Sequence, residues 1–162
     1  MTGLKEEILE ILSEDARTPV EKMAIMLGRP EAEITQAISE LEQDLIILKY
    51  SAHINREKAD HDLVEAVIEV RVTPQRDRGF ASIARRIYNF EEVRAVYLMS
   101  GGYDLQVQVE GHSLREVAFF VAEKLSTIEG VLSTATHFVL KKYKADGVIM
   151  DDEVDERLVI SP

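Results

Sequence analysis

The order of strand-like and helix-like segments between residues 63 and 143 most constrains the fold of this chain. Apolar residues recur there with the period of a strand or of a helix, in the order strand, helix, strand, strand, helix, strand. The expected strands are 63–72, 93–99, 104–109 and 131–143, and the expected helices are 79–90 and 113–126, with a turn at 73–78. This order predicts a ferredoxin-like βαββαβ domain. Both helices would cover one face of the sheet, so we expect a dimer that packs sheet against sheet to cover the other.

Capping signals mark the helix from 113 to 126. Ser113 and Glu116 have the spacing of a capping box, in which the serine and glutamate side chains bind backbone N–H groups at the start of a helix. The residues expected to face inward from this helix are Leu114, Val117, Ala118, Val121 and Leu125.

The first part of the chain has a different pattern. Three short helices are expected at 4–13, 19–27 and 30–43, followed by a strand-like run from Ile46 to Ile54. Thr18 and Glu21 have capping-box spacing at the start of the second helix, and Gly28 follows its end. This order predicts a winged helix-turn-helix, a common DNA-binding head, so the overall class is α+β. We expect a head at 1–54, a polar linker at 55–62, the ferredoxin-like domain at 63–147 and an acidic tail at 148–162. The tail is either a solvated linker with an added edge strand or a regulatory segment.

Composition excludes several classes of protein. The chain has no cysteine, so it has no disulfide or zinc-thiolate site, and its four histidines lack metal-ligand spacing. No apolar run is long enough to cross a membrane, and the N-terminus lacks a signal-peptide pattern. We therefore expect a cytoplasmic protein with no membrane partner, metal or cofactor, and no serine–histidine–aspartate order or phosphate loop suggests an enzyme.

Motifs along the chain carry a resemblance to a known family. They are residues 8–12, 15–17, 23–28 and 41–50 in the head, and residues 96–104 and 130–139 in the second domain. In this order and spacing the chain resembles the Lrp/AsnC family of transcriptional regulators, also called feast/famine regulators. The resemblance implies an effector-binding ferredoxin-like domain, dimers that often assemble to octamers, and amino-acid-responsive transcription. The chain departs from the family at Glu33 and Ala37, where Thr and Arg are common, and at Leu45, where glycine is common.

A candidate DNA surface covers the exposed side of the third helix and the wing. Residues expected near bases or phosphates are Arg29, Thr35, Gln36 and Ser39, and the expected phosphate neutralisers are Lys22, Lys49, Arg56 and Lys58. The same helix carries Glu31, Glu33, Glu40 and Glu42, and the net charge of the chain is −11, which opposes binding to phosphates. The alternative is that these are ordinary solvated residues of a head that does not bind DNA.

A candidate effector site lies at the turn Ser100, Gly101, Gly102, Tyr103 and Asp104. Two glycines expose backbone N–H groups that can hold a carboxylate, Asp104 can bind an ammonium group, and Tyr103 can close over a side chain. These groups match an amino acid, and we expect Thr134 and Thr136 to meet the turn across a subunit interface. The alternative is a plain hairpin whose Asp104 caps its own turn. Lys141, Lys142 and Lys144 are expected to be solvated residues that protect a sheet edge.

The leading hypothesis is a regulator that binds double-stranded DNA and responds to a small effector, expected to be an amino acid, as a homodimer or octamer. One alternative is an effector-binding assembly protein whose head is only structural, which the acidic third helix favours. The other is an enzyme resembling siroheme decarboxylase, which would need cationic groups converging on substrate carboxylates.

Overall fold

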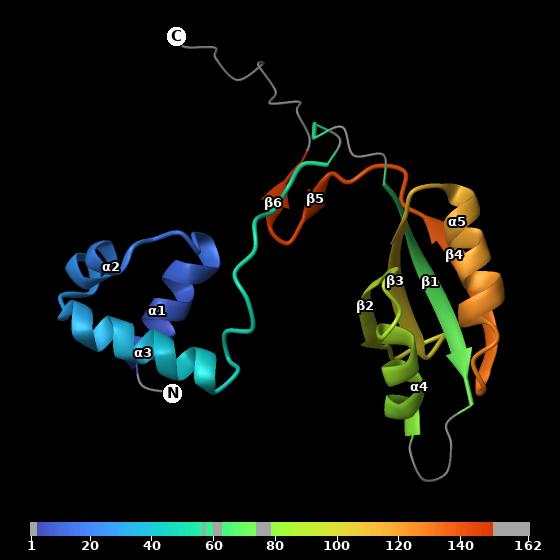
Figure 1. Cartoon of the computed structure of the whole chain (residues 1–162), viewed down its shortest axis with the longest axis horizontal. Coiled ribbons are helices and arrows are strands. Elements are labelled where there is room, and N and C mark those ends of the chain that lie inside the picture. The colour runs from blue at the N-terminus through green and yellow to red at the C-terminus, as the bar shows by residue number, and fades with distance from the viewer. Residues whose placement is uncertain (1–2, 57, 60–62, 74–78, 151–162) are drawn as a thin grey trace. The chain divides into compact units, whose positions relative to one another are not determined.

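The computed structural model describes residues 3–56, 58–59, 63–73 and 79–150, and the chain divides into two compact units, Met1–His53 and Ile54–Pro162 (Figure 1). We call them the head unit and the sheet unit. Residues 74–78 of the predicted turn at 73–78, part of the predicted linker and the predicted tail from 151 onward lie outside the described residues. No helix among the described residues is long and apolar enough to span a membrane.

The head unit consists of α1 (Gly3–Glu14), α2 (Val20–Leu27) and α3 (Glu31–Gln43). Its core contains the buried side chains Ile8, Met23, Ile34, Ala37 and Leu41, with Ile38 partly buried beside them. The inner face of α3 is therefore the one that the helical spacing predicts. Helices this short are marginal alone, so the shared core stabilises all three.

The ends of α2 follow the sequence signals only in part. Gly28 has φ 61°, and the Arg29 N–H donates to the Ala24 carbonyl at 3.0 Å, so α2 ends as predicted. The predicted capping box at Thr18 and Glu21 is wrong. Pro19 takes the N-cap position, and it has no side-chain oxygen to accept a backbone N–H.

The C-terminus of α3 is closed by a Schellman motif with leucine in the usual glycine position. The Leu45 N–H donates to the Glu42 carbonyl at 3.1 Å, and the Ile46 N–H donates to the Leu41 carbonyl at 2.9 Å. Leu45 has φ 55°, in the left-handed region that disfavours side chains with a Cβ atom. Its side chain is 72% exposed, so burial offsets little of this strain.

The predicted wing is not formed. Residues 46–54 have no strand, and only Ile47 of this run packs against the head core. β-branched residues favour a strand only when a second strand accepts their backbone hydrogen bonds. The described part of the head unit has no such strand, so the head is a helix-turn-helix without a wing.

The sheet unit has the predicted ferredoxin-like topology. Its strands β1 (Val64–Val72), β2 (Val93–Leu98), β3 (Leu105–Gly111) and β4 (Val131–Phe138) form an antiparallel sheet in the order β2-β3-β1-β4. Alternate residues of β1 and β3 form the buried core with residues from α4 (Gly79–Tyr88), α5 (Leu114–Phe119) and the π-helix η1 (Phe120–Leu125). Because the helices share this core, they cover the same face of the sheet. The opposite face of β3 carries Gln106, Gln108 and Glu110.

The predicted helix from 113 to 126 begins as expected and then changes its winding. The Ser113 Oγ accepts the Glu116 N–H at 3.1 Å, while the Glu116 carboxylate accepts the His112 N–H at 2.7 Å, one residue earlier than in a standard capping box. The π-helical turn η1 uses five-residue spacing. Phe120 is buried and meets Phe90 edge-on at 5.5 Å, whereas Leu114 and Ala118, predicted to face inward, are exposed.

The last predicted strand is shorter than expected. β4 ends at Phe138 instead of Tyr143, and a small hairpin of β5 (Lys144–Ala145) and β6 (Val148–Ile149) follows. Lys144 therefore lies in this hairpin, away from the four-stranded sheet.

We predict that Leu45→Gly stabilises the head unit by about 0.5–1 kcal/mol. Glycine removes the strain of the left-handed conformation, and this gain exceeds the extra conformational entropy that glycine loses on folding. Gly28→Ala is the matched control and should lower the stability of the head unit, since it places a Cβ at φ 61°. Urea unfolding followed by far-UV circular dichroism measures both. A loss of stability in Leu45→Gly would show that the exposed leucine makes a stabilising contact.

Candidate functional site

The exposed face of α3 is uncharged at its centre. At about 100° per residue, the positions opposite the buried Ile34 and Leu41 are Ala32, Gln36, Ser39 and Gln43. The four carboxylates flank this stripe, with Glu31 and Glu42 on one side and Glu33 and Glu40 on the other. The acidic character of the helix is therefore confined to its flanks, and amide and hydroxyl groups occupy the centre.

Three of the four flanking carboxylates have partners. Arg29 pairs with Glu33 at 3.7 Å, Lys5 with Glu40 at 2.8 Å, and the Tyr50 hydroxyl donates to Glu42 at 2.9 Å. The Lys5 hydrogen bond lowers the pKa of Glu40 below its ordinary value. Burial and the hydrogen bond to Glu42 raise the pKa of Tyr50. Two of these pairs cannot be predicted from the sequence of α3 alone, because Lys5 and Tyr50 come from other segments.

Most of the predicted DNA-contacting residues lie on the head unit. Lys22, Arg29, Thr35, Gln36 and Lys49 are exposed, and Ser39 is half-buried. The hydroxyl of Thr35 donates to the Glu31 carbonyl at 2.9 Å, and Gln43 Nε2 donates to Ser39 Oγ at 3.3 Å. The α3 helix thus brings together Thr35, Gln36 and Ser39, next to Arg29 at its N-terminus.

Two predicted DNA-contacting residues belong to the sheet unit instead. The Arg56 guanidinium pairs with Glu110 of β3 at 3.5 Å, and the Lys58 backbone N–H donates to Asn55 at 3.2 Å. Both residues were predicted to contact DNA from the linker at 55–62, and the structure assigns them to the sheet unit.

The turn predicted to bind an effector connects β2 to β3. It is closed by the Met99 N–H, which donates to the Asp104 carbonyl at 2.8 Å. Gly101 has φ 144°, so only one of the two glycines uses the positive-φ freedom. The Tyr103 hydroxyl donates to Gln106 at 3.3 Å.

Asp104 continues the sheet with its side chain. Its backbone N–H donates to the Val70 carbonyl at 3.1 Å, and its Oδ2 accepts the Val72 N–H at 2.8 Å. The regular pairing of β1 with β3 ends at Val70 and Leu105, so the carboxylate replaces the next rung of the ladder. Asp104 therefore caps β1 and not its own turn, and one carboxylate oxygen is used in doing so.

Thr134 lies at the same end of the sheet as the turn, on the other side of β1. Thr134 pairs with Val70 and Thr136 with Ile68, so both side chains point to the helix-covered face with those residues. The Thr134 hydroxyl lies 3.4 Å from the Ser126 hydroxyl. Within one chain, β1 thus separates the threonines from the turn.

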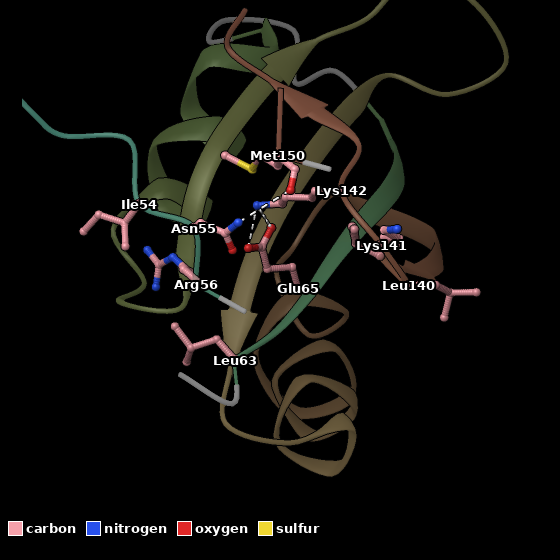
Figure 2. A pocket seen from close by; sticks show the side chains of 10 residues that line it. Ile54, Asn55, Arg56, Leu63, Glu65, Leu140, Lys141, Lys142 and Met150 are labelled. Atoms are coloured by element: carbon pink, nitrogen blue, oxygen red, sulfur yellow. Dashed lines mark hydrogen bonds and ion pairs between the residues drawn. The ribbon is translucent and has the colours of Figure 1, made fainter. Parts of the chain in front are cut away.

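The sheet unit contains a hollow of about 150 Å³ that sequence reasoning missed. Figure 2 shows the side chains that line it. Its lining residues are Ile54, Asn55, Arg56, Leu63, Glu65, Val139, Leu140, Lys141, Lys142 and Met150. Lys142 pairs with Glu65, and Asn55 Nδ2 donates to the Met150 carbonyl at 3.5 Å. None of the predicted effector residues lines it. Two sequence signals lie at it, the lysine cluster at 141–144 and Arg56, which was predicted to neutralise phosphates.

Comparisons with known proteins identify the family. Residues 65–149 match the model of the Lrp/AsnC ligand binding domain. The chain is also 49% identical over 164 aligned residues to the uncharacterized HTH-type transcriptional regulator YugG of Bacillus subtilis, covering 100% of this chain and 99% of that protein. The chain belongs to the Lrp/AsnC family. Its relatives are named as transcriptional regulators, so the protein is an Lrp/AsnC regulator and not an enzyme of the siroheme decarboxylase kind.

Solved structures agree on the fold of this Lrp/AsnC chain. E. coli AsnC superposes with a TM-score of 0.72 at 23% identity, covering 93% of this chain and 99% of AsnC. The feast or famine regulatory protein of M. tuberculosis, solved in complex with L-methionine, superposes with a TM-score of 0.75 at 21% identity, covering 93% and 99%.

We predict that Asp104→Ala destabilises the sheet unit by about 1–3 kcal/mol, because the part-buried Val72 N–H loses its acceptor. Asp104→Asn keeps an oxygen in the same place and should cost less than half as much. Urea unfolding of both variants tests this structural role separately from any ligand. Equal losses in the two variants would contradict it.

Proposed function

We propose that the head unit binds double-stranded DNA and that the sheet unit binds an amino acid, so that the effector controls transcription. The observation that carries the DNA part is the uncharged stripe on α3. Its flanking carboxylates Glu33, Glu40 and Glu42 have partners within the head. Amide and hydroxyl groups can read base edges, and pairing Glu33 and Glu40 with cations reduces their repulsion of phosphates.

In this proposal α3 enters the major groove, and Arg29, Lys22 and Lys49 contact phosphates. A single head of a protein with net charge −11 gains little affinity from electrostatics. Affinity then depends on several linked heads, because the second head binds with a high effective concentration. We therefore propose a homodimer that can assemble to an octamer, acting in the cytoplasm.

The domain assignment follows from DNA binding by the head unit and effector binding by the sheet unit. We assign 1–54 to DNA binding, 55–62 to a linker, 63–147 to effector binding and assembly, and 148–162 to an acidic tail. The absence of a strand at 46–54 in the single chain is compatible with this assignment, since α3 and its turn from α2 carry the DNA surface.

We place the effector site at the β2–β3 turn, from Ser100 to Asp104. The backbone at Gly101 and Gly102 would hold the ligand carboxylate, and the oxygen of Asp104 that does not cap β1 would accept its ammonium group. Tyr103 would cover the ligand side chain, and Thr134 and Thr136 of a second subunit would complete the site. The fold shared with the L-methionine complex of M. tuberculosis supports an amino acid as the ligand class.

For DNA binding, we predict a salt-sensitive complex with the upstream region of the protein's own gene. The logarithm of the binding constant should fall linearly with the logarithm of salt concentration, and Lys22→Ala should reduce the slope by about 1 per bound head. Lys144→Ala, in the β5–β6 hairpin, is the matched control and should leave the slope unchanged. Fluorescence anisotropy at several salt concentrations measures the slope. No complex even at low salt, with and without amino acids, would refute DNA binding.

For the effector, we predict that L-methionine or another standard amino acid raises the melting temperature of the protein. Gly101→Ala should weaken binding about tenfold, the equivalent of one charge-assisted hydrogen bond, because φ 144° strains any residue with a Cβ. Gly147→Ala at φ 83° is the control, since it introduces similar strain in a different hairpin. Thermal shift identifies the amino acid that binds, and isothermal titration calorimetry then compares its affinity for the two variants. The effector site is wrong if both variants bind equally well.

A further inference from the structure

We propose that Gln36 is the residue of the head that reads a base, that the base is adenine, and that Glu40 anchored by Lys5 positions the Gln36 amide. This inference rests on the proposed DNA binding and extends it to one contact. It assigns a role to two charged residues, Lys5 and Glu40, that were not predicted to contribute to the DNA surface.

The contacts form a short chain from α1 to the exposed face of α3. Lys5 Nζ lies 2.8 Å from Glu40 Oε2, and Gln36 Nε2 donates to Glu40 Oε1 at 2.9 Å. Each carboxylate oxygen of Glu40 therefore binds one partner. Gln36 and Glu40 are four residues apart, so both side chains lie on adjacent turns of one helix.

The glutamine amide has the groups that adenine requires. An amide can accept a hydrogen bond from adenine N6 and donate one to N7 at the same time. Gln36 uses one of its two N–H groups on Glu40. Its second N–H and its carbonyl oxygen have no partner among the described residues, and the side chain is exposed near the centre of the uncharged stripe. One N–H group and the carbonyl oxygen of the amide thus remain for a base.

The other polar residues of α3 are less suited to this role. The Thr35 hydroxyl donates to a backbone carbonyl of its own helix, and Ser39 accepts from Gln43. Gln43 is at the C-terminal end of α3, whereas a recognition helix contacts bases mainly from its N-terminal part. Gln36 combines a donor, an acceptor and a fixed orientation in that N-terminal part.

Glu40 would repel phosphates if it were unpaired, and its pairing explains how it is tolerated next to a base-reading residue. Lys5 supplies the compensating charge and also fixes the carboxylate. Its hydrogen bond also lowers the pKa of Glu40. An ordered glutamine also loses less side-chain freedom when it binds, which favours discrimination between bases.

The experiment is selection of bound sequences from a random DNA duplex pool by the full-length protein at low salt. The wild-type protein should enrich adenine at one or more positions. Gln36→Ala should lose that preference, with a drop in discrimination of roughly 5- to 150-fold at that position and little change in binding to unselected DNA.

The positioning role is tested with variants of equal charge change. Glu40→Ala should lose the adenine preference, while Glu42→Ala, which removes a carboxylate from the other flank of the same helix, should keep it. Both should bind unselected DNA more tightly to a similar extent, because each removes one negative charge. Glu40→Gln should restore the preference only in part, because its single amide oxygen can still accept the Gln36 N–H but its NH2 group cannot pair with Lys5. Circular dichroism melting verifies that each variant is folded.

The outcomes separate the inference from the function on which it rests. If the wild-type protein retains no duplex, DNA binding is refuted and the inference falls with it. If the wild-type protein selects a sequence and Gln36→Ala selects the same one, only the reading role is wrong. If Glu40→Ala and Glu42→Ala behave alike, the positioning role is overturned.

Discussion

The pairing of β1 on both of its edges organises the sheet unit. β1 pairs with β3 along one edge and with β4 along the other, and its alternate residues Ala66, Ile68, Val70 and Val72 are all buried under the helices. A central strand of this kind fixes the register of its neighbours, since a shift by one residue would turn its buried face to water. The position of the β2–β3 turn and of Thr134 follows from that register.

The same constraint explains the role of Asp104. Where β3 leaves β1, the next backbone N–H of β1 needs an acceptor, and a carboxylate supplies it. A residue that looks like a ligand-binding group in the sequence is thus also part of the sheet. Binding of an effector ammonium group to the second oxygen would connect the ligand directly to the end of the central strand.

The spacing of apolar residues and glycines predicted the features of the fold that are set by nearby residues in the sequence. The strand order, the inner face of α3 and the Gly28 turn all follow from spacing and from glycine chemistry. The errors arose where the outcome depends on a distant partner or on a backbone irregularity. The wing needed a second strand, and helical periodicity did not show that Leu114 and Ala118 of α5 would be exposed while Phe120 is buried. For the candidate site, the residue types of the turn were evident, but the Lys5–Glu40 and Tyr50–Glu42 contacts join separate segments and could not be read from α3 alone.

The π-helical turn also affects how this chain is compared with its relatives. A π turn is equivalent to an α-helix that has gained one residue, with the surplus accommodated by widening one turn. The Ser126 N–H accordingly reaches back five residues to Val121. A relative whose corresponding helix is α-helical throughout should therefore align to this chain with a one-residue gap between 120 and 125. An ungapped alignment would shift the helix residues on one side of this turn by one position and match buried side chains with exposed ones.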